Sequence, residues 1–78
     1  MNAYPTVRQE EVLRDLAQHP EDPLSSRAQR LRITRSAVYQ TLAALEVKEL
    51  TSHGDAGEWW LTARGRKWLG QVHAGAVR

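Results

Sequence analysis

The sequence predicts a single, mainly α-helical domain with one small β-hairpin near its C-terminal end. Two observations support this fold class. Apolar residues first recur with helical spacing, in segments that are separated by prolines or by short capping residues. After Leu50 the apolar spacing changes to every second residue, around a glycine-containing loop that is typical of a hairpin. The 78 residues suffice for one domain, which we expect to span residues 1–78, and not for two.

The first helix is expected from about Thr6 to Gln18. Thr6 and Gln9 have the spacing of a capping box, in which each side chain accepts a hydrogen bond from the other residue's backbone N–H. Pro20 and Pro23 end this helix at His19, because proline lacks an N–H and restricts the residue before it. The residues expected on its buried face are Leu13, Leu16 and Ala17, with Val12 at the border.

A short second helix is expected over residues 26–31, with Ser25 as its N-cap. Its buried contacts should come from apolar residues, which leaves its arginines on the outside. These apolar residues are Leu24, Ala28 and Leu31. Arg32 and Ile33 then form a tight turn before the next cap, Thr34.

The third helix, from about Arg35 to Lys48, has the clearest helical pattern. Its expected core stripe is Val38, Leu42 and Leu45. The opposite strip is Ser36, Gln40, Ala43 and Val47, with Tyr39 at its edge. This strip is nearly uncharged, whereas a merely solvated helix face is normally rich in Lys and Glu.

Two short strands are expected at residues 50–53 and 58–61, with glycines at positions 54 and 57 of the loop between them. Side chains alternate along a strand, so Trp59 and Leu61 should face one way and Trp60 the other. A last helix then runs from its cap Thr62 to about Ala74. Its expected apolar stripe is Leu61, Gly65, Trp68, Val72 and Ala76, with Leu69 beside it.

Gly65 lies inside this last helix, where glycine costs about 1 kcal/mol relative to alanine. We therefore expect another backbone to approach it closely. At the two ends of the chain, residues 1–5 and 75–78 are expected to fray.

Positive charge is concentrated in the middle of the chain, although the formal net charge is only +2. Four arginines fall within nine residues: Arg27, Arg30, Arg32 and Arg35. No acidic residue lies between Asp22 and Glu46. A local positive field of this kind attracts a polyanion, although a short basic stretch is also compatible with an ordinary solvated surface.

Composition argues against several other classes of function. The chain has no cysteine, which excludes disulfides, thiolate metal sites and cysteine nucleophiles. His19, His53 and His73 have no ligand-type residue at helical spacing, and no catalytic motif is present. No apolar run approaches the roughly 20 residues of a membrane helix, and the N-terminus lacks the pattern of a signal peptide. We expect a cytoplasmic protein with no catalytic residues, metal, cofactor or membrane contact.

The stretch from Leu24 to Leu50 resembles the helix-turn-helix of winged-helix transcription regulators of the MarR and PadR kind. The matching positions are Thr34, Ser36, Tyr39, Leu42, Leu45 and Leu50. Residues 60–66, Trp-Leu-Thr-Ala-Arg-Gly-Arg, are similar to the family signature that closes the wing and begins the next helix. The resemblance covers about residues 24–69 and implies a winged helix-turn-helix fold, with a three-helix core, a two-stranded wing and a C-terminal helix.

Three positions depart from the family pattern. The family usually has glycine where this chain has Arg32 and Glu49. Both positions often require a left-handed backbone, which costs a non-glycine residue about 1 kcal/mol. Arg27 stands where the family commonly has a buried leucine, so the second helix is expected to be shorter or rotated.

The resemblance implies sequence-specific binding of double-stranded DNA by a transcriptional regulator or repressor. Helix 35–48 would enter the major groove, with wing residues 52–60 along the backbone or the minor groove. Base contacts are expected from Arg35, Ser36, Tyr39 and Gln40. Backbone contacts are expected from Arg27, Arg30, Arg32, Thr34, Arg64, Arg66 and Lys67. Many relatives are homodimers, and the expected two-fold contact is Trp68, Leu69 and Val72.

Two alternatives stay open. A winged-helix module can bind protein, in which case the uncharged strip and Trp60 would form the docking surface; the clustered arginines argue against this. A replication or excision accessory factor of a mobile element is the other. Trp60 could also face solvent, a second subunit or the sugar-phosphate backbone. We expect no second domain for sensing a small-molecule effector within these residues, and a pocket between the two halves of a dimer stays open as an alternative.

Overall fold

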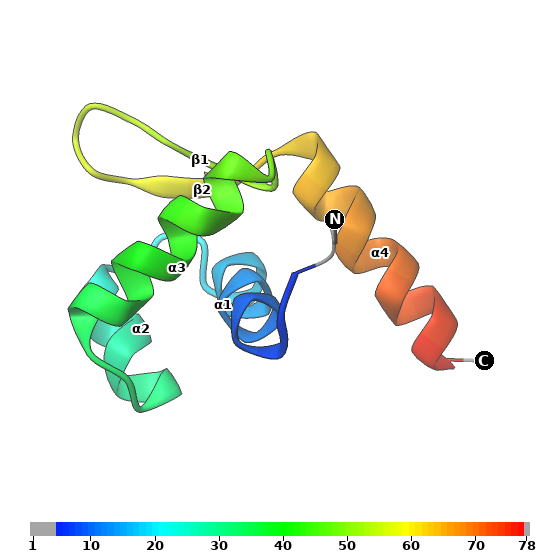
Figure 1. Ribbon diagram of the computed structural model, residues 1–78, viewed down its shortest axis with the longest axis horizontal. Helices are drawn as coiled ribbons and strands as arrows, with labels where there is room; N and C mark the ends of the chain where they lie inside the picture. The colour runs from blue at the N-terminus through cyan, green and yellow to red at the C-terminus, as the bar shows by residue number, and fades with distance from the viewer. Residues whose placement is uncertain (1–4, 78) are drawn as a thin grey trace.

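The computed structural model describes the backbone of residues 5–77 and the side chains of residues 5–70 (Figure 1). Three helices are followed by an antiparallel hairpin and a C-terminal helix. This is the topology of a winged helix, so the predicted fold class is confirmed. The elements are α1 (Val7–Gln18), α2 (Leu24–Leu31), α3 (Arg35–Val47), β1 (Thr51–His53), β2 (Trp59–Leu61) and α4 (Ala63–Val77).

Helix α1 begins with the predicted capping box. The Gln9 N–H donates to Thr6 Oγ1 at 3.2 Å, and the Thr6 N–H donates to Gln9 Oε1 at 3.0 Å. The buried face differs from the predicted one by one position: Val12 is fully buried, whereas Ala17 is exposed. The core therefore meets the side of α1 that holds Val12, Leu13 and Leu16.

Helix α2 begins at Leu24, so Ser25 is inside the helix and the prediction that it is the cap was wrong. Pro23 is the N-cap residue and provides no side-chain hydrogen bond. At the other end, Arg32 has a left-handed backbone with φ of 60°. Glu49 likewise has φ of 65°. Arg32 and Glu49 thus both adopt the left-handed backbone that the sequence resemblance led us to expect at these positions.

Helix α3 is capped as predicted, since the Ala37 N–H donates to Thr34 Oγ1 at 3.0 Å. It ends at Val47, one residue before the predicted end, and Lys48 is its C-cap. The predicted core stripe is confirmed: Val38, Leu42 and Leu45 are all fully buried.

The hairpin strands are each one residue shorter than predicted, and they pair Thr51 with Leu61 and His53 with Trp59. Thr51 donates to the carbonyl oxygen of Leu42 at 2.9 Å, which fastens β1 to α3. Trp59 is buried and Trp60 is 43% exposed, so the two indoles face opposite ways as predicted. Of the two loop glycines, Gly57 has the positive φ, 86°.

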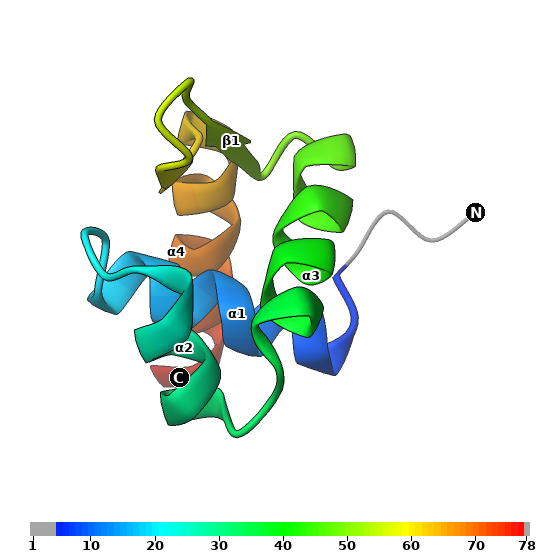
Figure 2. The same ribbon diagram turned by 90° about the vertical axis from the view of Figure 1, so that its left-hand side faces the viewer.

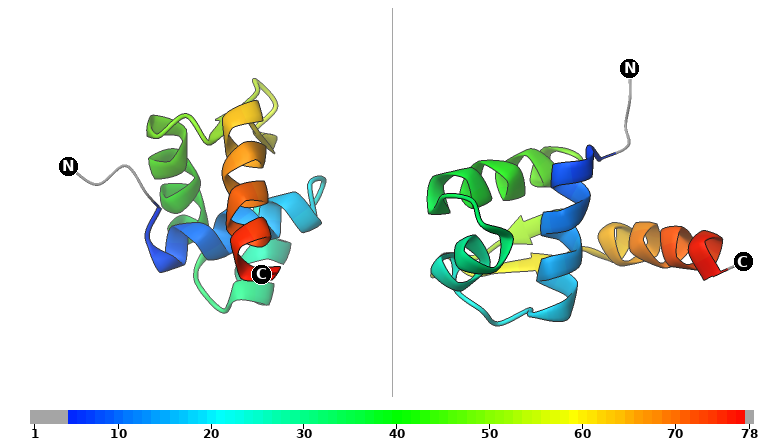
Figure 3. Two further views of the ribbon diagram at one scale, coloured as in Figure 1. Left: turned by 90° about the vertical axis from the view of Figure 1, so that its right-hand side faces the viewer. Right: turned by 90° about the horizontal axis from the view of Figure 1, so that it is seen from below.

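Helix α4 is capped by Thr62, which accepts the Gly65 N–H at 3.0 Å. A Cβ at Gly65 would overlap the carbonyl oxygen of Leu50, so the predicted close approach of another backbone is confirmed. The helix extends to Val77, three residues beyond its predicted end. Its C-terminal end points away from the other helices, whereas α2, the start of α3 and the hairpin loop lie at the opposite end of the molecule (Figures 1 and 3).

Candidate nucleic-acid interface

The outer strip of α3, which is the set Ser36, Gln40, Ala43 and Val47, lies opposite the buried stripe of the same helix. Ser36 and Gln40 are exposed, Ala43 is partly exposed and Val47 is 84% exposed. None of the four is charged. Ser36, Gln40 and Val47 are therefore open to a ligand, whereas Ala43 also packs against the core. Figure 2 shows α3 at one side of the domain.

Tyr39 lies beside the outer strip and is held in place by the hairpin. Its ring, 54% exposed, meets the buried Trp59 ring edge-on, with 6.0 Å between the centroids and 78° between the planes. The other neighbour of Trp59 is His53, at 4.9 Å, and His53 Nδ1 lies 2.8 Å from Glu46 Oε2 on α3. These contacts fix the orientation of Tyr39 relative to the hairpin, which the sequence did not predict.

Arg32 and Arg35 flank the N-terminal end of α3 and are both exposed. Neither forms an ion pair with another residue in the described part of the chain. Thr34, between them, accepts the hydrogen bond that caps α3. These two arginines are the positive charges nearest to the start of the outer strip.

Arg27 is buried, contrary to the expectation that the arginines of α2 lie outside. Its side chain is 1% exposed, and its Nη1 donates to Asp15 Oδ2 at 2.9 Å and to the Asp15 carbonyl oxygen at 3.3 Å. Asp15 is itself 5% exposed. The prediction that Arg27 contacts a DNA backbone is therefore wrong: the residue fills a core position and binds α1 to α2.

Arg30 is also engaged within the domain. Its Nε and Nη2 donate to the carboxylate of Asp15, and its Nη1 lies 3.2 Å from Asp22 Oδ2. Burial alone would raise the pKa of Asp15, but the hydrogen bonds and charges of Arg30 and Arg27 outweigh burial and hold it below its ordinary value. The same hydrogen bond to Asp15 raises the pKa of Arg30. Two of the four clustered arginines therefore pair with acidic residues of the same domain, Asp15 and Asp22.

A second basic group lies on the first two turns of α4, and its members are Arg64, Arg66 and Lys67. All three are exposed. Arg64 forms an exposed ion pair with Glu49 at 3.0 Å, and Arg66 donates to the carbonyl oxygen of Leu61 at 3.2 Å. Because Glu49 follows α3 directly, this basic group lies near the C-terminal end of α3.

The hairpin has the opposite charge. Asp55 and Glu58 are exposed, and residues 51–61 contain no Lys or Arg. Glu58 accepts the Ala56 N–H at 3.1 Å, within the loop. Such a surface offers little attraction to phosphate groups.

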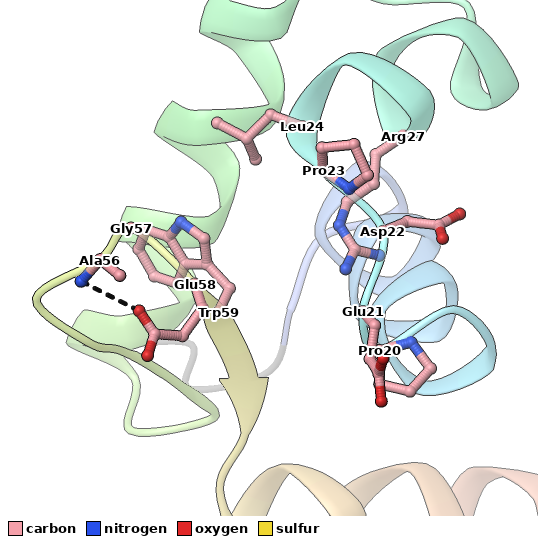
Figure 4. A pocket seen from close by; sticks show the side chains of 10 residues that line it. All are labelled: Pro20, Glu21, Asp22, Pro23, Leu24, Arg27, Ala56, Gly57, Glu58 and Trp59. Carbon is pink, nitrogen blue, oxygen red and sulfur yellow. Dashed lines mark hydrogen bonds between the residues drawn. The ribbon is translucent and has the colours of Figure 1, made fainter.

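A hollow of about 280 Å³ separates the α1–α2 loop from the hairpin. Trp59 of the hairpin lines one side of it, and Pro23, Leu24 and Arg27 line the other (Figure 4). Glu21 and Glu58 also contribute to the lining. Since Arg27 already donates to Asp15, the hollow presents no free basic group to an anion.

Of the three residues predicted for a two-fold contact, Leu69 is 6% exposed and belongs to the core of its own domain. Trp68 is half-buried against the same core. The side chain of Val72 lies outside the described residues. Leu69 is therefore not available for a contact with a second subunit, because it packs α4 against the core of its own domain.

No model of a known protein family matches the sequence, and no match was found among curated proteins or solved structures. No helix in residues 5–77 is long and apolar enough to cross a membrane. Among the side chains of residues 5–70, no three His, Cys, Asp or Glu gather closely enough to hold a metal ion. The order of its helices and strands is consistent with a winged-helix topology.

Proposed function

We propose that the protein binds double-stranded DNA in a sequence-specific manner and acts as a transcriptional regulator of the MarR and PadR kind, without catalysis. One observation carries this proposal: α3 exposes an uncharged strip that has basic residues near both of its ends. Neutral polar side chains can hydrogen-bond base edges, and basic side chains attract phosphates, so the arrangement matches the two kinds of contact that DNA requires.

The dimensions support insertion of α3 into the major groove. The groove is about 12 Å wide, and a helix with its side chains is about 10–12 Å in diameter. Gln40 can pair with adenine through two hydrogen bonds, and Arg35 can pair with guanine in the same way. Tyr39 and Ser36 are suited to phosphate oxygens, and the contact with Trp59 orients Tyr39 before DNA arrives.

The number of available basic residues limits how many phosphate groups the protein can contact. Seven basic residues were predicted to contact DNA, and Arg27 and Arg30 are occupied by Asp15. Five members of that set remain, namely Arg32, Arg35, Arg64, Arg66 and Lys67. At about 0.9 counterions released per phosphate, the plot of log affinity against log salt should be no steeper than about −4.5 per subunit. A slope beyond about −6 would require phosphate contacts from basic residues outside this set and would contradict the proposed surface.

Selection of bound sites from random duplex DNA tests the proposal. We expect enrichment of a defined sequence, and its symmetry and half-site spacing would also report whether two copies bind together. Gln40→Ala and Arg35→Ala should reduce discrimination between sites by about 1–3 kcal/mol each. Gln18→Ala and Arg8→Ala are matched controls, since both residues are in α1 and away from the strip. Recovery of unenriched DNA would refute sequence-specific binding.

A second candidate, docking to a protein, is favoured by the hairpin. This element is acidic, and it exposes 43% of Trp60, an aromatic type enriched at protein interfaces. Retention on heparin and on nonspecific duplex DNA separates the two functions. A protein-docking surface should be released at low salt, whereas a DNA-binding surface should be retained until screening weakens its phosphate contacts.

A further inference from the structure

The outer strip of α3 is divided into a polar and an apolar half. Ser36 and Gln40 occupy the N-terminal half, and Ala43 and Val47 the C-terminal half. Val47 is 84% exposed, the highest value among the large apolar side chains in the described part of the domain. Its methyl groups do not contribute to the core and are free for an apolar contact with a ligand.

In the major groove only thymine presents a methyl group, while adenine presents the donor and acceptor pair that glutamine matches. We infer that the strip recognises A·T base pairs, with Ala43 and Val47 contacting thymine methyl groups next to an adenine bound by Gln40. This inference rests on the proposed DNA binding and adds the class of sequence that is bound.

The spacing along the helix fits neighbouring base pairs. With a rise of about 1.5 Å per residue, Ala43 lies about 4.5 Å along the axis from Gln40, and Val47 about 6 Å beyond Ala43. Successive bases on one strand are about 3.4 Å apart. Consecutive members of the set therefore address base pairs one to two steps apart, and Gln40 and Val47 address base pairs about three steps apart, within a short A·T-rich tract.

The C-terminal half of the outer strip contains no charged residue, and Lys48, which follows Val47, donates to Gln9 Oε1 on α1 at 2.7 Å. Guanine is read chiefly by Arg or Lys, and cytosine by Asp or Glu. Arg35 lies before the strip, at the first residue of the helix. Glu46, the acid nearest to Val47, is directed to His53 on the hairpin, with 2.8 Å between Oε2 and Nδ1. Beyond Gln40 the outer strip offers only methyl groups.

Removing the thymine methyl tests the inference directly. The selected duplex is compared with a duplex in which every thymidine is replaced by deoxyuridine, which differs only in that methyl group. Loss of one buried methyl should weaken binding about fourfold, and loss of two about fifteenfold. Val47→Ala should bind the thymine duplex several-fold more weakly and should lose only about fourfold on deoxyuridine substitution, because a single methyl contact remains.

Val7→Ala is the matched control, because Val7 is 78% exposed on α1. It should keep the full fifteenfold sensitivity to deoxyuridine. Equal affinity of wild type for the two duplexes, or a Val47→Ala variant with full sensitivity, would overturn the inference while leaving DNA binding intact. Failure of wild type to enrich any duplex would instead refute the proposed function and point to protein docking on this strip. Circular dichroism of each variant confirms that the fold is unchanged.

Discussion

Replacing Asp15 with asparagine should strongly destabilise the domain. Asp15 is 5% exposed and lies 2.9 Å from the guanidinium of Arg27, which is 1% exposed. The substitution keeps the shape of the side chain but leaves a buried positive charge without its counter-ion. Breaking a buried pair in this way typically costs about 3–5 kcal/mol, and we expect the lower end, because the Asp15 carbonyl still accepts from Arg27.

The loss is large for a domain of this size. A chain of 78 residues has a total free energy of unfolding of about 4–12 kcal/mol. A loss of about 3 kcal/mol should lower Tm by about 12–24 °C. Urea unfolding followed by circular dichroism measures the change in free energy, and thermal melting provides an independent value.

A second substitution separates the buried charge from a general effect of the position. In Asp15→Asn/Arg27→Leu the unpaired charge is replaced by an apolar side chain, so the double variant should be more stable than Asp15→Asn alone by at least about 2 kcal/mol. Glu11→Gln is the matched control: its ion pair with Arg8 is exposed, and its loss should cost less than about 1 kcal/mol. A cost below 1 kcal/mol for Asp15→Asn, or no recovery in the double variant, would refute this reasoning.

Three further predictions concern the pH dependence of stability and the backbone. The folded state lowers the pKa of Asp15, so the Asp15 carboxylate stabilises the fold above its ordinary pKa of 3.8, and this stabilisation is lost as pH falls through the folded-state pKa. In Asp15→Asn the urea midpoint should therefore depend less on pH between about pH 5 and pH 2 than in the wild type. Gly65→Ala should cost about 2 kcal/mol or more, because its Cβ would meet a backbone oxygen, while Gly70→Ala, with no atom near its added Cβ, should gain about 1 kcal/mol. Arg32→Gly should raise the free energy of unfolding by about 1 kcal/mol, by relieving the left-handed backbone, and should weaken DNA binding; loss of both stability and binding would contradict it.

The elements that the sequence predicted well are those in which local chemistry and burial agree. Thr34 caps α3 because its hydroxyl accepts an amide that no helical carbonyl can reach, and Val38, Leu42 and Leu45 then repeat at the helical period. The close approach of another backbone at Gly65 could also be predicted from the sequence. Glycine in a helix needs an explanation, and the carbonyl oxygen of Leu50 provides one.

Helix α2 was harder to predict, because its buried face contains a charge. A hydrophobicity pattern assigns arginine to the surface, and Arg27 is buried only because Asp15 faces it from another helix. A signal was nevertheless present: Asp15 stands between Leu13 and Leu16 on the apolar side of α1. An acid and a base that each interrupt an apolar face can indicate one buried pair, but their pairing depends on how the helices pack.

The buried pair also changes where a polyanion would be held. The sequence suggested one basic centre on α2 and the following turn, but Arg27 and Arg30 are neutralised by Asp15 and Asp22. The other basic residues predicted to contact DNA lie at two places, one before α3 and one on the start of α4, with the uncharged strip between them. For the proposed complex, this distribution favours α3 lying along the groove, with phosphates held near both of its ends. The acidic hairpin is then directed away from the backbone, and its exposed Trp60 is left available to a protein neighbour.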